Sequence, residues 1–150
     1  MKFANFPILI PAFTARIYID TPLPIAADLL NIPFLPSAGT LISEPNYRPA
    51  LRATFVHGSD FLRRDPDGQM VRLDVTSVAR DATGALLRFN YNGVVGMTGD
   101  EGKIIRGDVN ATTTGFWQRL LGSGRFIVEE NEPIVVEYKI SEVGAPCGGE

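Results

Sequence analysis

The sequence predicts an all-β protein, a single small antiparallel β-barrel of about seven or eight strands joined as a meander, and it leaves open whether the barrel closes completely. Three observations predict this fold. Apolar and polar residues alternate with a period of two, turns rich in glycine, proline and aspartate recur at short spacing, and only one short segment has a helical pattern. The 150 residues suit one domain with a real core. Residues 1–12 are expected to be an N-terminal extension and residues 144–150 a flexible tail.

The first strand is expected at residues 13–20, where Phe13, Ala15, Ile17 and Ile19 alternate with polar residues. Two prolines, Pro22 and Pro24, end it because they cannot donate hydrogen bonds to a neighbouring strand. Residues 25–31 fit one helical turn or a folded loop equally well, since prolines flank them.

Later strands follow the same alternation. They are expected at residues 51–56, 70–80, 85–97, 103–113, 125–129 and 134–143, and one short helix is expected at residues 115–121. Turns are predicted at residues 65–68, 81–84 and 99–102, which each end on glycine, and at residues 131–133. The run Asp65-Pro66-Asp67-Gly68 resembles the start of a calcium loop, but it lacks the later ligands and is interpreted as a hairpin turn.

Composition excludes several kinds of partner. The net charge of −3 and the pI of about 5.2 argue against nucleic acid, because no basic excess is available to meet phosphates. No segment has the roughly 18–20 apolar residues of a membrane span. The apolar start MKFANFPILIPAF contains two prolines and no cleavage pattern, so it is interpreted as structural and the protein as cytoplasmic.

The ligand types that metals and cofactors need are scarce. The chain has one histidine, His57, and one cysteine, Cys147, so a zinc or iron site of the usual ligand set cannot be assembled. Neither a phosphate-binding Gly-x-x-x-x-Gly-Lys loop nor a dinucleotide fingerprint occurs. The sequence therefore predicts no cofactor and no metal, and it leaves acid–base chemistry by carboxylates and arginines.

Polar residues on two strands have two interpretations. Arg72, Asp74 and Thr76 share one strand face, and Arg88, Asn90 and Asn92 share a face of the next strand, opposite Tyr91. They belong either to a water-facing exterior with cross-strand ion pairs or to a barrel lumen, where a few polar groups orient a ligand.

Asp60 is the first candidate for chemistry. It follows Gly58-Ser59 at the end of an apolar strand, where no helix needs a cap. A partly buried carboxylate near an arginine is poised by two opposing effects, since desolvation raises its pKa and the arginine lowers it. The alternative is a structural carboxylate bonded to nearby backbone amides. His57, which directly precedes Gly58-Ser59, is interpreted as structural, with ligand binding as the alternative.

The motifs together resemble a known family. They are, in order, Phe13-Thr14-Ala15, Pro36-Ser37-Ala38-Gly39-Thr40, Gly58-Ser59-Asp60-Phe61, Asp65-Pro66-Asp67-Gly68, Arg72-Leu73-Asp74-Val75, Asn90-Tyr91-Asn92-Gly93, Gly122-Ser123-Gly124-Arg125-Phe126 and the run from Val136 to Val143. This order resembles the domain-of-unknown-function 3237 family in the form found in filamentous fungi. The resemblance implies a small β-barrel similar to the allene oxide cyclase and dirigent barrels, which bind apolar molecules in the lumen.

The resemblance marks Asp60, Asp74 and Asn90 as shared positions. The chain departs from the pattern between Thr114 and Gly122, where it is shorter than such relatives, so a partner subunit in a homodimer would supply a missing edge.

The resulting hypothesis is a cofactor-independent isomerase, cyclase or lyase of secondary metabolism that acts on a small apolar molecule. Asp60, Asp74 and Arg88 are its candidate catalytic residues. The candidate ligand-binding residues are Arg72, Asn90, Asn92, Tyr91 and His57. The alternatives are a binding barrel without chemistry and a structural or interaction domain.

Overall fold

The computed structural model describes residues 4–97, 104–113 and 116–145, with the backbone alone for residues 104–113 and 116–119. These residues form strands and no helix, and thus no helix that could cross a membrane. The strands are β1 (Ile8–Tyr18), β2 (Leu23–Ala26), β3 (Leu29–Pro33), β4 (Thr40–Ser43), β5 (Arg52–Arg64), β6 (Met70–Asp81), β7 (Leu86–Gly96), β8 (Ile104–Thr113), β9 (Phe116–Ile127) and β10 (Val135–Gly144). The predicted all-β class is confirmed.

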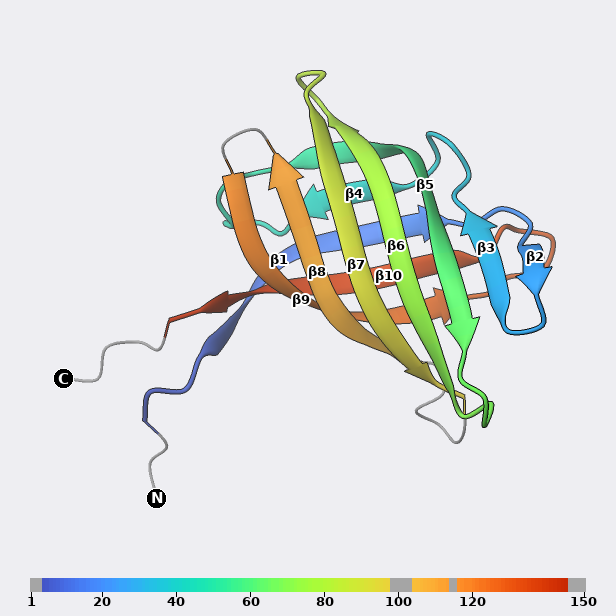
Figure 1. Cartoon of the computed structure of the whole chain (residues 1–150). Helices are drawn as coiled ribbons and strands as arrows, with labels where there is room; N and C mark the ends of the chain where they lie inside the picture. Colours follow the sequence, from blue (N-terminus) through green and yellow to red (C-terminus); the bar gives the residue numbers. More distant parts are fainter. Residues whose placement is uncertain (1–3, 98–103, 114–115, 146–150) are drawn as a thin grey trace.

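The long strands β1 and β5 to β10 curl into an open half-barrel in which β5 to β10 follow one another as an antiparallel meander (Figure 1). β10 then pairs with β1. The short strands complete the circuit on the remaining side, because β4 pairs with both β1 and β5, and β3 pairs with the second half of β5.

A partner subunit was expected because a barrel edge seemed to be missing. The described strands pair at that place, so this reason no longer holds. β8 pairs with β9 from Ile104↔Arg125 to Thr113↔Phe116, directly across the segment where a shortening was expected. A homodimer therefore stays a prediction, but a missing edge no longer supports it.

Two local predictions were wrong. Residues 25–31 contain no helical turn, since β2 and β3 form a hairpin in which Leu23 pairs with Asn31. Pro24 is tolerated there because β2 is the edge strand of the sheet. The helix expected at residues 115–121 is strand β9 from Phe116 onward, because pairing with β8 and β10 on both sides overrides the weak local pattern.

The first strand begins earlier than predicted. β1 starts at Ile8 and not at Phe13, and it pairs with β10 up to Ile8↔Gly144. The expected extension therefore ends before Ile8, and Gly144 is the last residue of β10 and not part of the tail. Residues 146–150, including Cys147, lie outside the described residues. The short β4 was not predicted.

The predicted turns are confirmed where the structure describes them. In the turn at residues 65–68, the amide of Gly68 donates to the carbonyl of Asp65 (2.8 Å) and Gly68 has φ +73°. Gly84 has φ +90° in the next hairpin, and Asn131 has φ +62° between β9 and β10. The turn expected at residues 99–102 lies outside the described residues.

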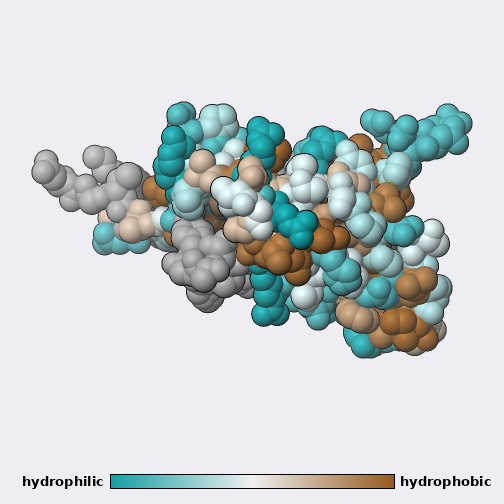
Figure 2. Space-filling view, turned by 90° about the horizontal axis from the view of Figure 1, so that it is seen from above, coloured by the Kyte–Doolittle hydropathy of each residue, from teal (hydrophilic) through white to brown (hydrophobic). Residues whose placement is uncertain are grey.

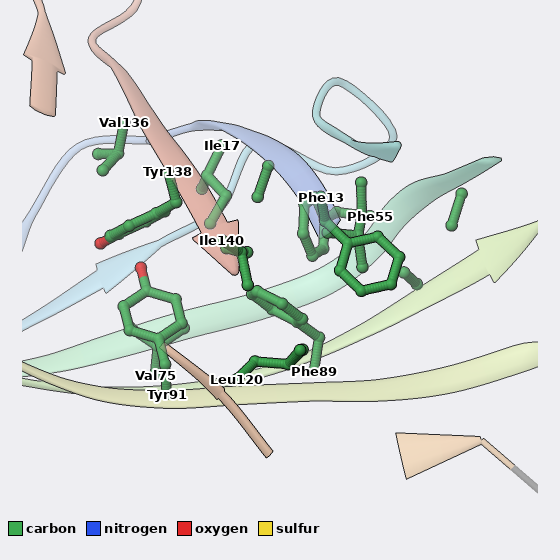
Figure 3. Packing of buried hydrophobic residues seen from close by; sticks show 14 of the residues in the cluster. Phe13, Ile17, Phe55, Val75, Phe89, Tyr91, Leu120, Val136, Tyr138 and Ile140 are labelled. Atoms are coloured by element: carbon green, nitrogen blue, oxygen red, sulfur yellow. The ribbon is translucent and has the colours of Figure 1, made fainter. Parts of the chain in front are cut away.

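Aromatic rings fill much of the barrel interior. Phe34, Phe55, Phe89, Tyr91 and Tyr138 form an unbroken series of edge-to-face contacts, with ring centroids 4.6–5.8 Å apart. Figure 3 shows the last four of these residues. Such contacts stabilise the core beyond their burial by about 0.5–1.5 kcal/mol each.

The outer face carries the ion pairs. Glu137 on β10 accepts from Arg16 on β1 (3.2 Å) and from Arg125 on β9 (3.2 Å). Such surface pairs each contribute a few tenths of a kcal/mol. At the end of the molecule that carries β2 and β3, hydrophobic side chains also reach the surface (Figure 2).

Candidate functional site

A narrow recess opens at the end of the barrel next to the β2–β3 hairpin. It is lined by residues of seven of the described strands and by two residues that follow β1 and β3: Ile17, Ile19, Ile32, Phe34, Asp60, Leu62, Leu73, Tyr91, Phe126, Val136 and Tyr138. About 30 Å³ of it admits water, and the space is about 360 Å³ when the open mouth is counted. The inner part thus holds about one water molecule or one small chemical group.

Asp60 is the one carboxylate in the lining of this recess. It is 8% exposed, and its Oδ1 atom accepts a hydrogen bond from the backbone amide of Asp74 (2.9 Å). Burial raises the pKa of Asp60 to about 6, the hydrogen bond from Asp74 lowers it in part, and the negative charge of Asp74 raises it further. A carboxyl group of this pKa exchanges protons readily near neutral pH.

The bonding of Asp60 combines the two interpretations made from the sequence. A backbone amide does bind the carboxylate, but this amide belongs to the neighbouring strand β6 and not to a nearby loop. The arginine that was expected to lower the pKa of Asp60 is absent from the described lining. Desolvation therefore prevails, and the net shift of the pKa is upward.

A bulge in β5 turns Asp60 inward. The register with β6 shifts between Phe55 and His57, so His57 points outward and Gly58 and Asp60 face the interior. Gly58 is needed there because a Cβ atom would come within 2.7 Å of the ring of Phe34 and 2.6 Å of the Cβ atom of Ser77. The Gly58-Ser59-Asp60 motif thus lets Phe34 close one wall of the recess beside the carboxylate.

Two tyrosines form a second wall of the recess. The rings of Tyr91 on β7 and Tyr138 on β10 pack edge to face with centroids 4.6 Å apart, and their hydroxyl ends point toward one another (Figure 3). Burial raises the pKa of Tyr91 well above its usual value, and a hydrogen bond with Tyr138 adds to the rise. Burial also raises the pKa of Tyr138, while the hydrogen bond from Tyr91 lowers it in part. Both groups are neutral phenols at physiological pH.

Of the predicted site residues, Asp60 and Tyr91 lie together at the recess. Of the two interpretations of the polar residues of β6 and β7, the exterior one is correct and the lumen one is wrong: Arg72, Asp74, Arg88 and Asn92 are exposed, and Asn90 is half-buried on the same outer face. Strict alternation explains this, because Tyr91 points inward and its neighbours Asn90 and Asn92 must then point outward.

The outward residues have other contacts. Arg72 donates two hydrogen bonds to Asp65 across the hairpin (2.9 and 3.0 Å), which lowers the pKa of Asp65. The amide oxygen of Asn90, when turned toward Arg88, accepts from its guanidinium group at 2.7 and 2.9 Å. His57 is exposed on β5. These contacts match the interpretation of the two polar faces as exterior surface.

Sequence reasoning missed Tyr138 and Phe34. Tyr138 stands on the apolar side of its strand, between Val136 and Ile140, but that pattern does not say which residue faces it across the barrel. Phe34 follows β3, where no strand was predicted. Among the described residues, no three histidine, cysteine, aspartate or glutamate side chains lie close enough to hold a metal ion.

The fold defines a class of protein, the small antiparallel β-barrels, and in this chain aromatic rings pack in the interior beside a recess that holds Asp60. Within this class the chain belongs to the protein family of unknown function DUF3237, whose model matches residues 7–121. The matched range includes Asp60 and Tyr91 and ends before Tyr138. A search of the curated proteins finds no match.

Solved structures show the same fold at low sequence identity. A conserved protein of unknown function from Rhodopseudomonas palustris has a TM-score of 0.68 and 14% identity, over 91% of this chain and 97% of that one. A protein of unknown function from Clostridium acetobutylicum has a TM-score of 0.67 and 15% identity, over 90% and 99%. A β-barrel-like protein from Acinetobacter baumannii AYE has a TM-score of 0.56 and 14% identity, over 89% and 96%.

These likenesses concern the fold. The fungal form of the family and the likeness to allene oxide cyclase and dirigent barrels stay predictions, because none of these comparisons bears on them.

Proposed function

We propose that this protein is a cofactor-independent isomerase, cyclase or lyase that acts on a small apolar metabolite, with Asp60 as the acid–base group. The observation that supports this proposal best is the place of Asp60: a carboxyl group that is 8% exposed and has a pKa of about 6, inside a recess otherwise lined by apolar and tyrosine side chains.

A structural role alone does not account for this carboxyl group. Its burial raises the pKa, so at neutral pH the fold holds a desolvated carboxylate at a cost of about 3 kcal/mol. Fold stability by itself favours an apolar residue or an amide at this position. A general base, by contrast, works best with a pKa near the working pH, and desolvation strengthens it as a proton acceptor.

The recess restricts what can react. Its inner part has room for one small group, and the partly exposed side chains of Ile19, Leu62 and Phe126 stand around the mouth. A ligand would insert its reactive end toward Asp60 and lay its apolar body on these side chains. The burial of that body would orient the reacting atoms.

Proton transfer by Asp60 is tested by deuterium exchange. The protein is incubated in D2O with a panel of small apolar carbon acids, such as ketones, enones and lactones, and uptake of deuterium is followed by NMR. We expect exchange above background with the natural chain, and its loss in Asp60→Asn. Asp67→Asn, in the exposed turn between β5 and β6, is the matched control. Equal exchange rates in the natural chain and Asp60→Asn would contradict the proposal.

A binding barrel without chemistry is the second candidate, and the mainly apolar lining of the recess favours it. Saturable binding of an apolar ligand, with no exchange or product in the natural chain and with unchanged affinity in Asp60→Asn, would identify this function. Thermal stability measured alongside would show that both proteins are folded.

A further inference from the structure

We infer that the substrate carries a carbonyl group next to the carbon that loses its proton, and that Tyr138 donates a hydrogen bond to the carbonyl oxygen while Asp60 takes the proton. This inference rests on the proposed function, because it names the substrate class for the same recess. It adds two tyrosines to the site. The sequence predicted Tyr91 only as a ligand-binding residue and did not point to Tyr138.

The three groups share one small space. Asp60, Tyr91 and Tyr138 all line the recess, and the tyrosines are 5% and 3% exposed. Their hydroxyl ends lie together in the interior (Figure 3). A ligand group that enters a space of about 30 Å³ contacts both walls at once, so it meets the carboxylate and the phenols together.

A hydrogen bond joins the two tyrosine hydroxyls. The two hydroxyl groups carry two hydrogens, and the hydrogen bond between them uses one. The second hydroxyl hydrogen is left to donate to a ligand in the recess, and in our proposal it is that of Tyr138. A buried donor of this kind calls for a ligand partner. A donor that itself accepts a hydrogen bond is also strengthened by it.

The chemistry balances without a further reactant. The C–H bond next to the carbonyl breaks, its proton moves to the carboxylate of Asp60, and its electron pair forms a carbon–carbon double bond. The carbonyl π electrons move to the oxygen, where the hydrogen bond from Tyr138 stabilises the negative charge. When Asp60 returns the proton to another carbon of the same enolate, the product is an isomer of the substrate.

The size of the recess places the carbonyl within the substrate. The inner part admits the carbonyl and the adjacent carbon but no bulky neighbour. The carbonyl therefore stands at one end of the molecule, and the apolar remainder lies at the mouth against Ile19, Leu62 and Phe126. Tyr91 does not need to contact the substrate, and it acts as a positioning residue that orients Tyr138.

Binding of 2-naphthol tests the oxygen contact, because this molecule carries an enol-like oxygen on a flat apolar body. We expect Asp60→Asn to bind it at least about tenfold more tightly than the natural chain, since the substitution removes a negative charge beside the oxygen. In that background, Tyr138→Phe should weaken binding about tenfold or more. 2-Methylnaphthalene, which lacks the oxygen, should bind equally to both. Tyr47→Phe, a buried tyrosine outside the recess lining, is the matched control.

Deuterium exchange into 2-tetralone tests the transition state. Tyr138→Phe should lower the exchange rate about 100-fold at saturation. Tyr91→Phe should lower it a few-fold with an unchanged half-saturation concentration, which a loss of structure would not produce.

The outcomes separate the two proposals. Exchange that is lost in Asp60→Asn but unchanged in Tyr138→Phe would overturn this inference and leave the proposed function standing. Failure of 2-naphthol to bind, or binding that ignores Tyr138→Phe, would also overturn it. Exchange that survives in Asp60→Asn would contradict the proposed function itself.

Discussion

Asp60 and Tyr91 lie in one row across the inner face of the sheet, with only Val75 between them. Asp60 pairs with Val75 across β5 and β6, and Val75 pairs with Tyr91 across β6 and β7. Two strand spacings separate their backbones by about 9–10 Å. The acid and the phenol both line the recess, so a substrate that enters it can meet both.

Stability should fall as the pH rises from about 4 to about 6. The pKa of Asp60 is 3.8 in the unfolded chain and about 6 in the fold, so the native state binds more protons in this window. The neutral acid therefore favours folding fully below pH 4, and this contribution of about 3 kcal/mol is lost above pH 6. Denaturant unfolding at a series of pH values measures it, and NMR titration of the Asp60 carboxyl carbon gives the pKa directly.

Asp60→Asn is the control for this pH effect. It should flatten the stability profile between pH 4 and 6 and raise stability at pH 7 by about 1–3 kcal/mol, because no charge is buried. Asp67→Asn should leave the slope in place. A profile that keeps its slope in Asp60→Asn would assign the effect to other groups.

Gly58→Ala should destabilise the fold by about 1–3 kcal/mol, since the new methyl group collides with Phe34 and Ser77. Urea unfolding measures this free energy. Gly96→Ala is the matched control, because its Cβ atom would meet only the Met70 sulfur at 4.0 Å and should change stability by less than about 0.5 kcal/mol. Equal effects of the two substitutions would contradict the close packing of Phe34 on β5.

Phe126→Ser should weaken 2-naphthol binding about tenfold, because Phe126 stands at the mouth where the apolar body of the ligand would lie. Its side chain is 41% exposed, so the fold should tolerate the change. Leu86→Ser, an exposed apolar residue at the start of β7 and outside the recess lining, should leave binding unchanged. Fluorescence titration of 2-naphthol distinguishes these results.

Arg88→Ala should leave 2-tetralone exchange unchanged and alter stability by less than about 0.5 kcal/mol, since the side chain is exposed on the outer face of β7. Exchange and urea unfolding are measured on the same preparation. A large loss of exchange with an intact fold would restore the catalytic role that the sequence suggested for Arg88.

The local signals in the sequence predicted most of the barrel. Alternation separated the two faces of β6 and of β7, and glycine and proline located the turns at residues 65–68 and 81–84. Prediction failed where the pairing with neighbouring strands determines the secondary structure of a segment. Phe116 to Leu121 has a helical pattern but becomes a strand between β8 and β10, and β4 is too short to show a pattern of its own.

The sequence predicted about half of the site, namely Asp60 and Tyr91 but neither Tyr138 nor Phe34. Asp60 stood out because an acid follows an apolar strand after Gly58-Ser59, and its high pKa follows from the burial that the structure gives it. The bulge at His57 was not predictable, although it sets which of the following residues face inward. The polar faces around Arg72 and Arg88 had two interpretations because alternation distinguishes two faces without saying which one is interior.

The sequence by itself determined the all-β class, the positions of the main turns and the candidacy of Asp60, because these depend on neighbours within a few residues along the chain. Only the tertiary structure decided that Tyr138 faces Tyr91, that Phe34 packs on Gly58, and that aromatic rings pack in series beside the recess. These contacts join strands that are distant in the chain, and they arise from strand register and barrel curvature. No local pattern of residues records either of them.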